Sequence, residues 1–87
     1  MKLDEALDLK NEIFKCPLKE SKEGLFVGID IPRSTVYDAS AEGCRLRIDT
    51  LIVNESSRNC LESIVKKRKL KMIESKGYLI IYTPRKK

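Results

Sequence analysis

The chain contains no histidine and no tryptophan, and aromatic residues make up only 6% of it. Without histidine, Ser-His-Asp and Cys-His nucleophiles, histidine acid–base catalysis and histidine-ligated metals are all excluded. No glycine-rich phosphate loop is present, because Gly24 and Gly28 lie at the start of and within an expected strand. No pair of carboxylates has a spacing that indicates a shared proton. We therefore predict a protein that is not an enzyme and that holds no cofactor and no metal.

Long apolar runs are also missing. No segment approaches the roughly 20 apolar residues that a membrane-spanning helix needs, so we expect no membrane partner. The first ten residues are amphipathic and acidic, unlike a secretory signal. The cysteines, Cys16, Cys44 and Cys60, are widely spaced and form no Cys-x-x-Cys pair. We interpret them as buried free thiols in a reducing compartment, with a disulfide as the alternative, and expect a cytoplasmic protein.

The 87 residues have room for one modest core, so we predict a single domain over residues 1–87, of which 84–87 form a disordered basic tail. The net charge of +5 is distributed unevenly. Residues 1–44 carry six Lys/Arg and nine Asp/Glu (net −3), whereas residues 45–87 carry twelve and four (net +8). A concentrated basic region attracts phosphates or acidic partners. The alternative is a solvated surface held in ion-pair networks.

Hydrophobic periodicity indicates the elements of the first half. Apolar residues recur at helical spacing over residues 3–15, which predicts an amphipathic helix that ends before Pro17. Alternation predicts a strand over residues 25–31, and we expect a short second strand over residues 35–37. The longest strand is predicted over residues 44–53. It alternates at first and then becomes apolar on both faces, as expected where a strand enters the covered centre of a sheet.

The second half predicts a helix and a hairpin. A polar residue between Asn54 and Ser57 caps a helix that extends to about Lys69. Strands follow over residues 70–73 and 78–83, joined by a tight turn whose glycine supplies a positive φ.

The resulting order of elements is α-β-(β)-β-α-β-β. It predicts the α+β class: a small two-layer α/β sandwich with a mixed sheet of four to five strands and two helices on one face. If the strands on either side of the second helix pair in parallel, their crossover is expected to be right-handed.

Two short segments are similar to known families. Residues Val27-Gly28-Ile29-Asp30-Ile31 resemble the first strand of actin-like ATPases and ribonuclease-H-like nucleases, where an Asp at the strand end holds a metal. Here Pro32 replaces the turn glycine of those families and no second metal carboxylate is identifiable. We therefore interpret Asp30 as a residue that bonds the local backbone at a strand end.

The second segment joins Ser57-Arg58-Asn59 to the hairpin strand Tyr78–Tyr82. These residues resemble the recognition helix and wing of winged-helix domains, in which the helix enters the major groove and the wing contacts the backbone. The resemblance implies a DNA-binding transcription regulator. Residues 46–53 depart from that family, because they are strand-like where a helix and a turn are expected.

Five cations lie within the six residues 66–71. Near a helix C-terminus they complement the helix dipole, and as part of a larger surface they would bind phosphates. Tyr78 and Tyr82 share one face of the last strand, where they either pack at the edge of the core or form a stacking platform for bases. The candidate nucleic-acid-binding residues are Arg45, Arg47, Arg58, Lys66, Lys67, Arg68, Lys69, Lys71, Lys76, Tyr78, Tyr82, Arg85, Lys86 and Lys87.

The main hypothesis is a nucleic-acid-binding module that contacts backbone phosphates through its basic C-terminal half and prefers RNA slightly over DNA. It requires the cations after residue 44 to gather on one accessible surface. The alternative is a non-catalytic protein–protein interaction subunit, as a homodimer or as a component of a complex. In that case a sheet edge or an apolar face pairs with the partner, Leu51 and Val53 are interface residues, and the basic half faces an acidic protein.

Overall fold

Four strands form one sheet in the computed structural model, which describes residues 1–17 and 27–84. The strands are β1 (Val27–Asp30), β2 (Arg45–Asp49), β3 (Lys71–Ser75) and β4 (Tyr78–Tyr82). Their order across the sheet is β1-β2-β4-β3, and all three pairings are antiparallel. The α+β class is therefore confirmed, but the prediction of a mixed sheet is wrong. β4 lies between β2 and β3, so the two strands that flank the second long helix never pair.

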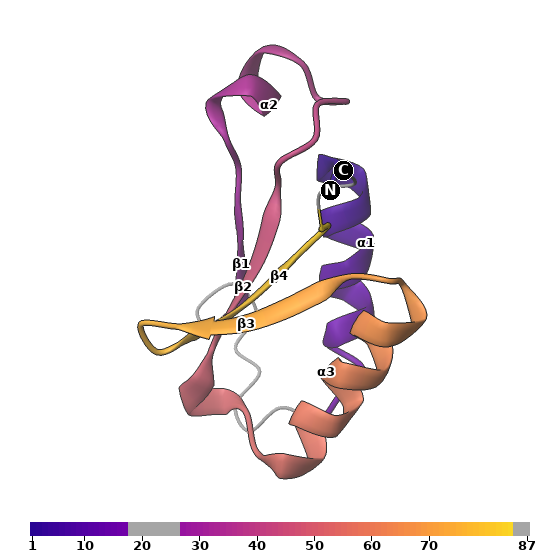
Figure 1. Cartoon of the computed structure of the whole chain (residues 1–87), viewed down its shortest axis with the longest axis vertical. Helices are drawn as coiled ribbons and strands as arrows, with labels where there is room; N and C mark the ends of the chain where they lie inside the picture. The colour runs from indigo at the N-terminus through magenta and orange to yellow at the C-terminus, as the bar shows by residue number, and fades with distance from the viewer. Residues whose placement is uncertain (18–26, 85–87) are drawn as a thin grey trace.

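Two long helices cover one face of this sheet (Figure 1). They are α1 (Leu3–Ile13) and α3 (Glu55–Lys67), close to the predicted ranges. A third, short helix, α2 (Arg33–Tyr37), lies beyond the end of the β1–β2 pair and away from the other two (Figure 1). No helix in residues 1–17 and 27–84 is long and apolar enough to cross a membrane.

The core lies between the helices and the sheet. Alternate residues of the central strands turn toward the helices and are buried, among them Leu46, Ile48 and Ile81. Leu9 of α1 and Leu61 of α3 are fully buried against them. Burial of one such aliphatic side chain stabilises the fold by about 1.5–3 kcal/mol. This burial fixes which face of β2 and of β4 points away from the helices, because side chains alternate along a strand.

The start of α3 follows the predicted capping chemistry. Asn54 Oδ1 accepts a hydrogen bond from the Ser57 backbone N–H at 2.9 Å, and Ser57 Oγ accepts one from the Asn54 N–H at 2.8 Å. The two side chains thus satisfy backbone donors at the helix start reciprocally. The tight turn is also confirmed, with Lys76 at φ 52° and Gly77 at φ 82°. Two consecutive positive φ angles are typical of the type I′ turn that joins hairpin strands.

Two predicted stretches of strand are wrong. Residues 35–37 belong to α2, which begins after Pro32, and only its Thr35 is buried. The β-branched residues there favoured a strand, but among the described residues no strand pairs with this segment. Residues 50–52 form a 3₁₀ turn instead of continuing β2, since Asp49 Oδ1 accepts a hydrogen bond from the Leu51 N–H at 2.9 Å. The turn buries Ile52 and leaves Leu51 75% exposed.

Cys16 and Cys60 form a disulfide, which corrects the prediction of three free thiols. The two cysteines are 44 residues apart in sequence, but α1 and α3 share one face of the sheet and bring their Cα atoms to 5.9 Å. That separation lies within the range a disulfide needs. Cys44 is the free cysteine, and it is buried beside Thr35.

Candidate nucleic-acid interface

The face of the sheet opposite α1 and α3 carries the residues that combine charge with aromatic rings. Leu46 and Ile48 of β2 and Leu79 and Ile81 of β4 point toward the helices. Their neighbours therefore project the other way. We call this surface the outer face, and it comprises Gly28, Asp30, Arg45, Arg47, Asp49, Lys71, Ile73, Ser75, Tyr78, Ile80 and Tyr82.

Two arginines of β2 lie over two tyrosines of β4 on this face. The guanidinium carbon of Arg45 is 5.8 Å from the centre of the Tyr82 ring, and that of Arg47 is 5.1 Å from the centre of the Tyr78 ring. The antiparallel register that pairs Arg47 with Ile80 brings the two sets of side chains together. Both contacts fall within the distance at which a cation is attracted to the face of an aromatic ring.

Asp30 lies beside this cluster on β1. Its Oδ1 is 3.6 Å from Arg47 Nη1, and each side chain is 46% exposed. The Asp30 carboxylate thus contacts a guanidinium on the neighbouring strand, whereas the sequence analysis expected it to bond the local backbone. Gly28 lies on the same face of β1, and a Cβ placed there would lie 3.9 Å from Arg47 Nη2, which is an ordinary contact distance. Arg47 is therefore held between a ring and a carboxylate.

The basic run at the end of α3 has a different environment. Arg68 Nε donates to Glu12 Oε1 at 2.7 Å, and Arg68 Nη2 donates to Asp8 Oδ2 at 3.0 Å. Lys67 Nζ donates to Glu12 Oε2 at 3.3 Å. The hydrogen bond from Arg68, with a smaller one from Lys67, holds the pKa of Glu12 below its ordinary value. The hydrogen bond to Asp8, followed by that to Glu12, raises the pKa of Arg68. Carboxylates of α1 therefore neutralise two of the predicted phosphate-binding cations.

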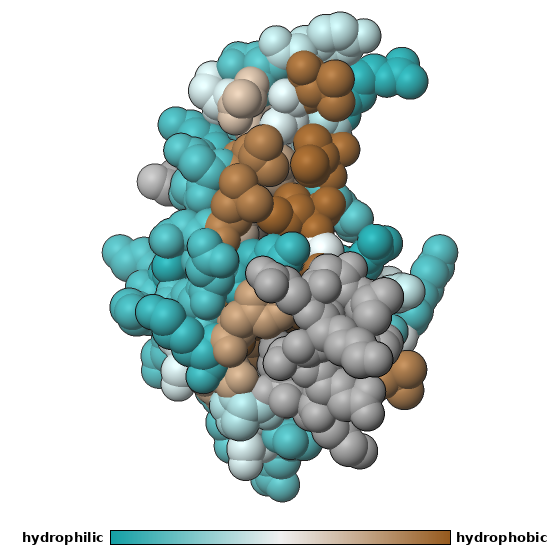
Figure 2. Space-filling model, turned by 180° about the vertical axis from the view of Figure 1, so that it is seen from behind, coloured by the Kyte–Doolittle hydropathy of each residue, from teal (hydrophilic) through white to brown (hydrophobic). Residues whose placement is uncertain are grey.

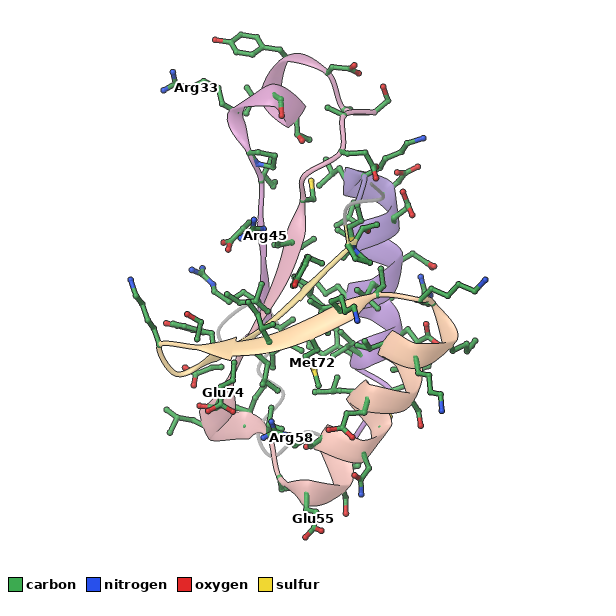
Figure 3. All side chains as sticks on the ribbon, in the orientation of Figure 1. Arg33, Arg45, Glu55, Arg58, Met72 and Glu74 are labelled. Atoms are coloured by element: carbon green, nitrogen blue, oxygen red, sulfur yellow. A yellow bond between two sulfur atoms is a disulfide. The ribbon has the colours of Figure 1, made fainter. Side chains whose placement is uncertain are left out.

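Arg58 is also paired. Its side chain contacts Glu62 one turn further along α3 and Glu74 on the edge strand β3, at 3.7 and 3.5 Å. Figure 3 shows Arg58 and Glu74 pointing toward one another. The winged-helix resemblance fails at the level of the fold, because β2 and a 3₁₀ turn precede α3 where that family has a helix and a turn.

The structure therefore divides the predicted binding residues among several places and does not gather all of them on one surface. Five share the outer face: Arg45, Arg47, Lys71, Tyr78 and Tyr82. The others lie along α3 (Arg58, Lys66, Lys67), in the segment after it (Arg68, Lys69) and in the β3–β4 turn (Lys76). Arg85, Lys86 and Lys87, with most of the predicted basic tail, lie outside the described residues.

Sequence reasoning did not assign Ile73, Asp30 or Asp49 to the candidate site. Ile73 pairs with Ile80 and is 46% exposed. The alternation in the last strand had already placed Ile80 beside the tyrosines, but no sequence signal gives the partner of a strand. The same is true of Asp30, since its approach to Arg47 depends on the pairing of β1 with β2.

A cleft of about 690 Å³ opens at the Tyr82 end of the outer face. Arg45 and Tyr82 contribute to its lining from the sheet, and Glu42, Pro84 and Met1 from adjoining segments. The volume lies within the range of small-molecule sites, which is roughly 300–1,000 Å³. Within residues 1–17 and 27–84, no three Cys, Asp or Glu side chains gather closely enough to hold a metal ion.

Exposed apolar residues are found at the far end of the β1–β2 pair. Val36 is 73% and Tyr37 84% exposed on α2, and Ile31 is 51% exposed before it. Figure 2 shows hydrophobic side chains gathered toward this end of the molecule. Exposed apolar clusters of this kind are typical of protein–protein contacts.

No protein-family model, curated protein or solved structure matches this chain. Function is therefore argued from the outer face itself.

Proposed function

We propose that the outer face binds single-stranded nucleic acid without catalysing a reaction on it. The observation that carries the proposal is the pair of Arg–Tyr contacts, Arg45 with Tyr82 and Arg47 with Tyr78, on adjacent strands of that face. Bases of a single strand stack on tyrosine rings and on guanidinium planes, and arginines also contact phosphates. One surface thus offers both kinds of contact that a single strand needs.

The cations around each tyrosine support this proposal. Lys71 pairs with Tyr82 across β3 and β4, so Tyr82 has Arg45 on one side and Lys71 on the other. Both cations are exposed. The proposed binding surface is smaller than the whole basic C-terminal half, because the carboxylates of Glu12 and Asp8 pair with cations of the basic run.

A single strand is favoured over a duplex because the rings need bases whose faces are accessible, and a paired and stacked helix hides them. RNA is slightly preferred over DNA in this proposal, since recognition of unstacked bases on a sheet is common for RNA. The prediction of a cytoplasmic protein depended on three free thiols, and the Cys16–Cys60 disulfide removes that argument, because disulfides are rare in reducing compartments outside hyperthermophiles.

Fluorescence anisotropy with a labelled single-stranded RNA, the matching DNA and the matching duplex tests the proposal. We expect both single strands to bind more tightly than the duplex at low salt, and their affinity to fall as salt rises. Absence of single-strand binding at low salt, or affinity that does not change with salt, would contradict it. The double variant Tyr78→Ala/Tyr82→Ala should abolish binding. Tyr37→Ala, on exposed α2, is the matched control and should leave binding unchanged.

A second function is favoured by the apolar end of the molecule. Val36 and Tyr37 on α2, and Ile31 just before it, expose half or more of their surface to solvent, whereas the predicted interface residue Leu51 is exposed at the opposite end of β2. We propose that this end docks onto another protein or onto a second copy of the chain if the outer face is not a binding surface. Light scattering after size exclusion tests this: a strict monomer that Val36→Ser leaves unchanged would count against the second copy.

A further inference from the structure

The positions of Tyr78 and Tyr82 along β4 determine how a strand can lie on the outer face, and the inference drawn here rests on the proposed function. The two tyrosines are four residues apart on one strand, with Ile80 between them on the same face. At roughly 3.4 Å per residue in an antiparallel strand, their Cα atoms are separated by about 14 Å.

This separation is larger than the spacing of neighbouring bases. Stacked nucleotides on one strand advance by about 3.4 Å each, so adjacent stacked bases cannot reach both rings. Bases that are splayed apart span the gap in fewer steps, but a single nucleotide step is still shorter than the gap. At least one base must therefore lie between the two that stack, and Ile80 offers it an apolar contact.

The two tyrosines also differ in their electrostatic surroundings. Tyr82 is flanked by Arg45 and Lys71, and it lines the cleft at the end of the sheet together with Arg45 and one acidic residue, Glu42. Tyr78 is flanked by Arg47, whose charge is partly offset by Asp30. It also pairs across the sheet with a second carboxylate, Asp49. Two cations and one acidic residue thus lie near Tyr82, against one cation and two acidic residues near Tyr78, and this balance favours a phosphate beside Tyr82.

We infer that the outer face holds a single strand through two non-adjacent bases, one at Tyr78 and one at Tyr82, and that the Tyr82 position is the stronger. Arg45 and Lys71 supply its phosphate contacts. Any base between the two positions contributes little to the affinity.

An abasic scan of a five-nucleotide single-stranded RNA tests this inference. Each nucleotide in turn is replaced by an abasic one, and the dissociation constant of each oligonucleotide is measured for the intact protein. We expect two positions, separated by at least one other, to lose about fivefold or more in affinity, which is the lower end of base–aromatic stacking. The larger loss should disappear in Tyr82→Ala and the smaller one in Tyr78→Ala. Tyr82→Phe keeps a ring and should retain the wild-type pattern.

The possible outcomes separate this inference from the proposed function. Equal losses at all five positions, or losses at two adjacent positions, would overturn the inference while single-strand binding stands. A larger loss from Tyr78→Ala than from Tyr82→Ala, with circular dichroism showing both variants folded, would overturn the order of the two positions. Failure of the unmodified oligonucleotide to bind at low salt would overturn the proposed function itself.

Discussion

The guanidinium of Arg47 lies 5.1 Å from the centre of the Tyr78 ring, and its other side faces Asp30 at 3.6 Å. Three strands contribute to this arrangement, since Asp30 comes from β1, Arg47 from β2 and Tyr78 from β4. A bound phosphate would compete with Asp30 for the arginine, and a bound base would compete with the arginine for the ring. Under the proposed function, binding would therefore replace internal contacts of the outer face with contacts to the ligand.

Removal of the Asp30 charge should strengthen binding. Asp30→Asn frees Arg47 and takes a carboxylate away from the path of the phosphates, and exposed pairs of this kind are worth up to about 1 kcal/mol. We expect single-strand affinity to rise about two- to fivefold at low salt, with a smaller effect at high salt. Glu62→Gln is the control, because it removes the same charge from α3. Equal gains in affinity in both variants would show that the effect comes from the net charge alone and not from the position of Asp30.

Substitution of Arg45 should weaken binding, whereas substitution of Arg68 should leave binding nearly unchanged. Arg45→Ala removes an exposed cation from the outer face, so we expect weaker single-strand binding and a salt slope smaller by about one. Arg68→Ala should leave binding within about twofold, because Arg68 already pairs with Glu12 and Asp8. Anisotropy across a salt series measures both. A larger loss of binding in Arg68→Ala than in Arg45→Ala would place the nucleic acid on the helical side of the molecule.

The ion pairs of Arg68 should stabilise the fold. Arg68 is only 29% exposed and reaches two carboxylates of α1. We expect Arg68→Ala to lower the midpoint of thermal unfolding by roughly 4–8 °C, which corresponds to about 1 kcal/mol in a domain of this size. Lys66→Ala, exposed on α3, should change stability by less than about 0.5 kcal/mol. Equal midpoints for the two variants would show that the cluster contributes nothing.

Glu12 should make part of the stability depend on pH. Its pKa is lowered from the ordinary value of 4.5, chiefly by the hydrogen bond from Arg68. The unfolded chain therefore takes up this proton more readily than the folded protein, and the stability that Glu12 contributes is fully present only above its unfolded pKa. It is lost as the pH falls through the lowered pKa of the folded protein. We expect the stability difference between wild type and Glu12→Gln to be constant near neutral pH and to close in acid. Urea unfolding at a series of pH values measures it, and a difference that widens in acid would contradict the account.

The Cys16–Cys60 disulfide should be measurable in the isolated protein. Its reduction, or Cys60→Ser, should lower the free energy of unfolding by about 2–4 kcal/mol, because the bond joins residues far apart in sequence. The unfolded, unreduced protein should show one reactive thiol, that of Cys44, of the three cysteines in the chain. Three reactive thiols under those conditions would show that the bond is absent. Urea unfolding with and without a reductant measures the stability difference.

Local signals explain which parts of the fold were predictable. The apolar periodicity of α1, the Asn54 cap of α3 and the Gly77 turn each depend on a few neighbouring residues, and all three are present. Residues 35–37 and 50–52 were predicted as strand from their β-branched and apolar side chains. The structure of those segments depends on whether a neighbouring strand pairs with them and on the Asp49 side-chain cap, and local propensity predicts neither. The purely antiparallel sheet and the Cys16–Cys60 bond depend on contacts between distant segments, which the sequence does not show.

The candidate site was predictable only in part. Alternation along the last strand placed Tyr78 and Tyr82 on one face. Tyr82 contacts Arg45 and Tyr78 contacts Arg47 because β2 pairs with β4. These two strands are separated in the sequence by α3 and β3, so local patterns do not reveal the pairing. The expected single basic surface did not form, because α1 packs beside the end of α3 and its carboxylates pair with the nearest cations.

The most direct test is a two-dimensional ¹H–¹⁵N NMR titration of the intact protein with a single-stranded RNA of five nucleotides at low salt. We predict that the largest amide shifts fall on β2 and β4, around Arg45, Arg47 and Tyr78–Tyr82, and that they persist in Arg68→Ala. Shifts confined to the end of α3 or to α2, with β2 and β4 unchanged, would contradict single-strand binding by the outer face.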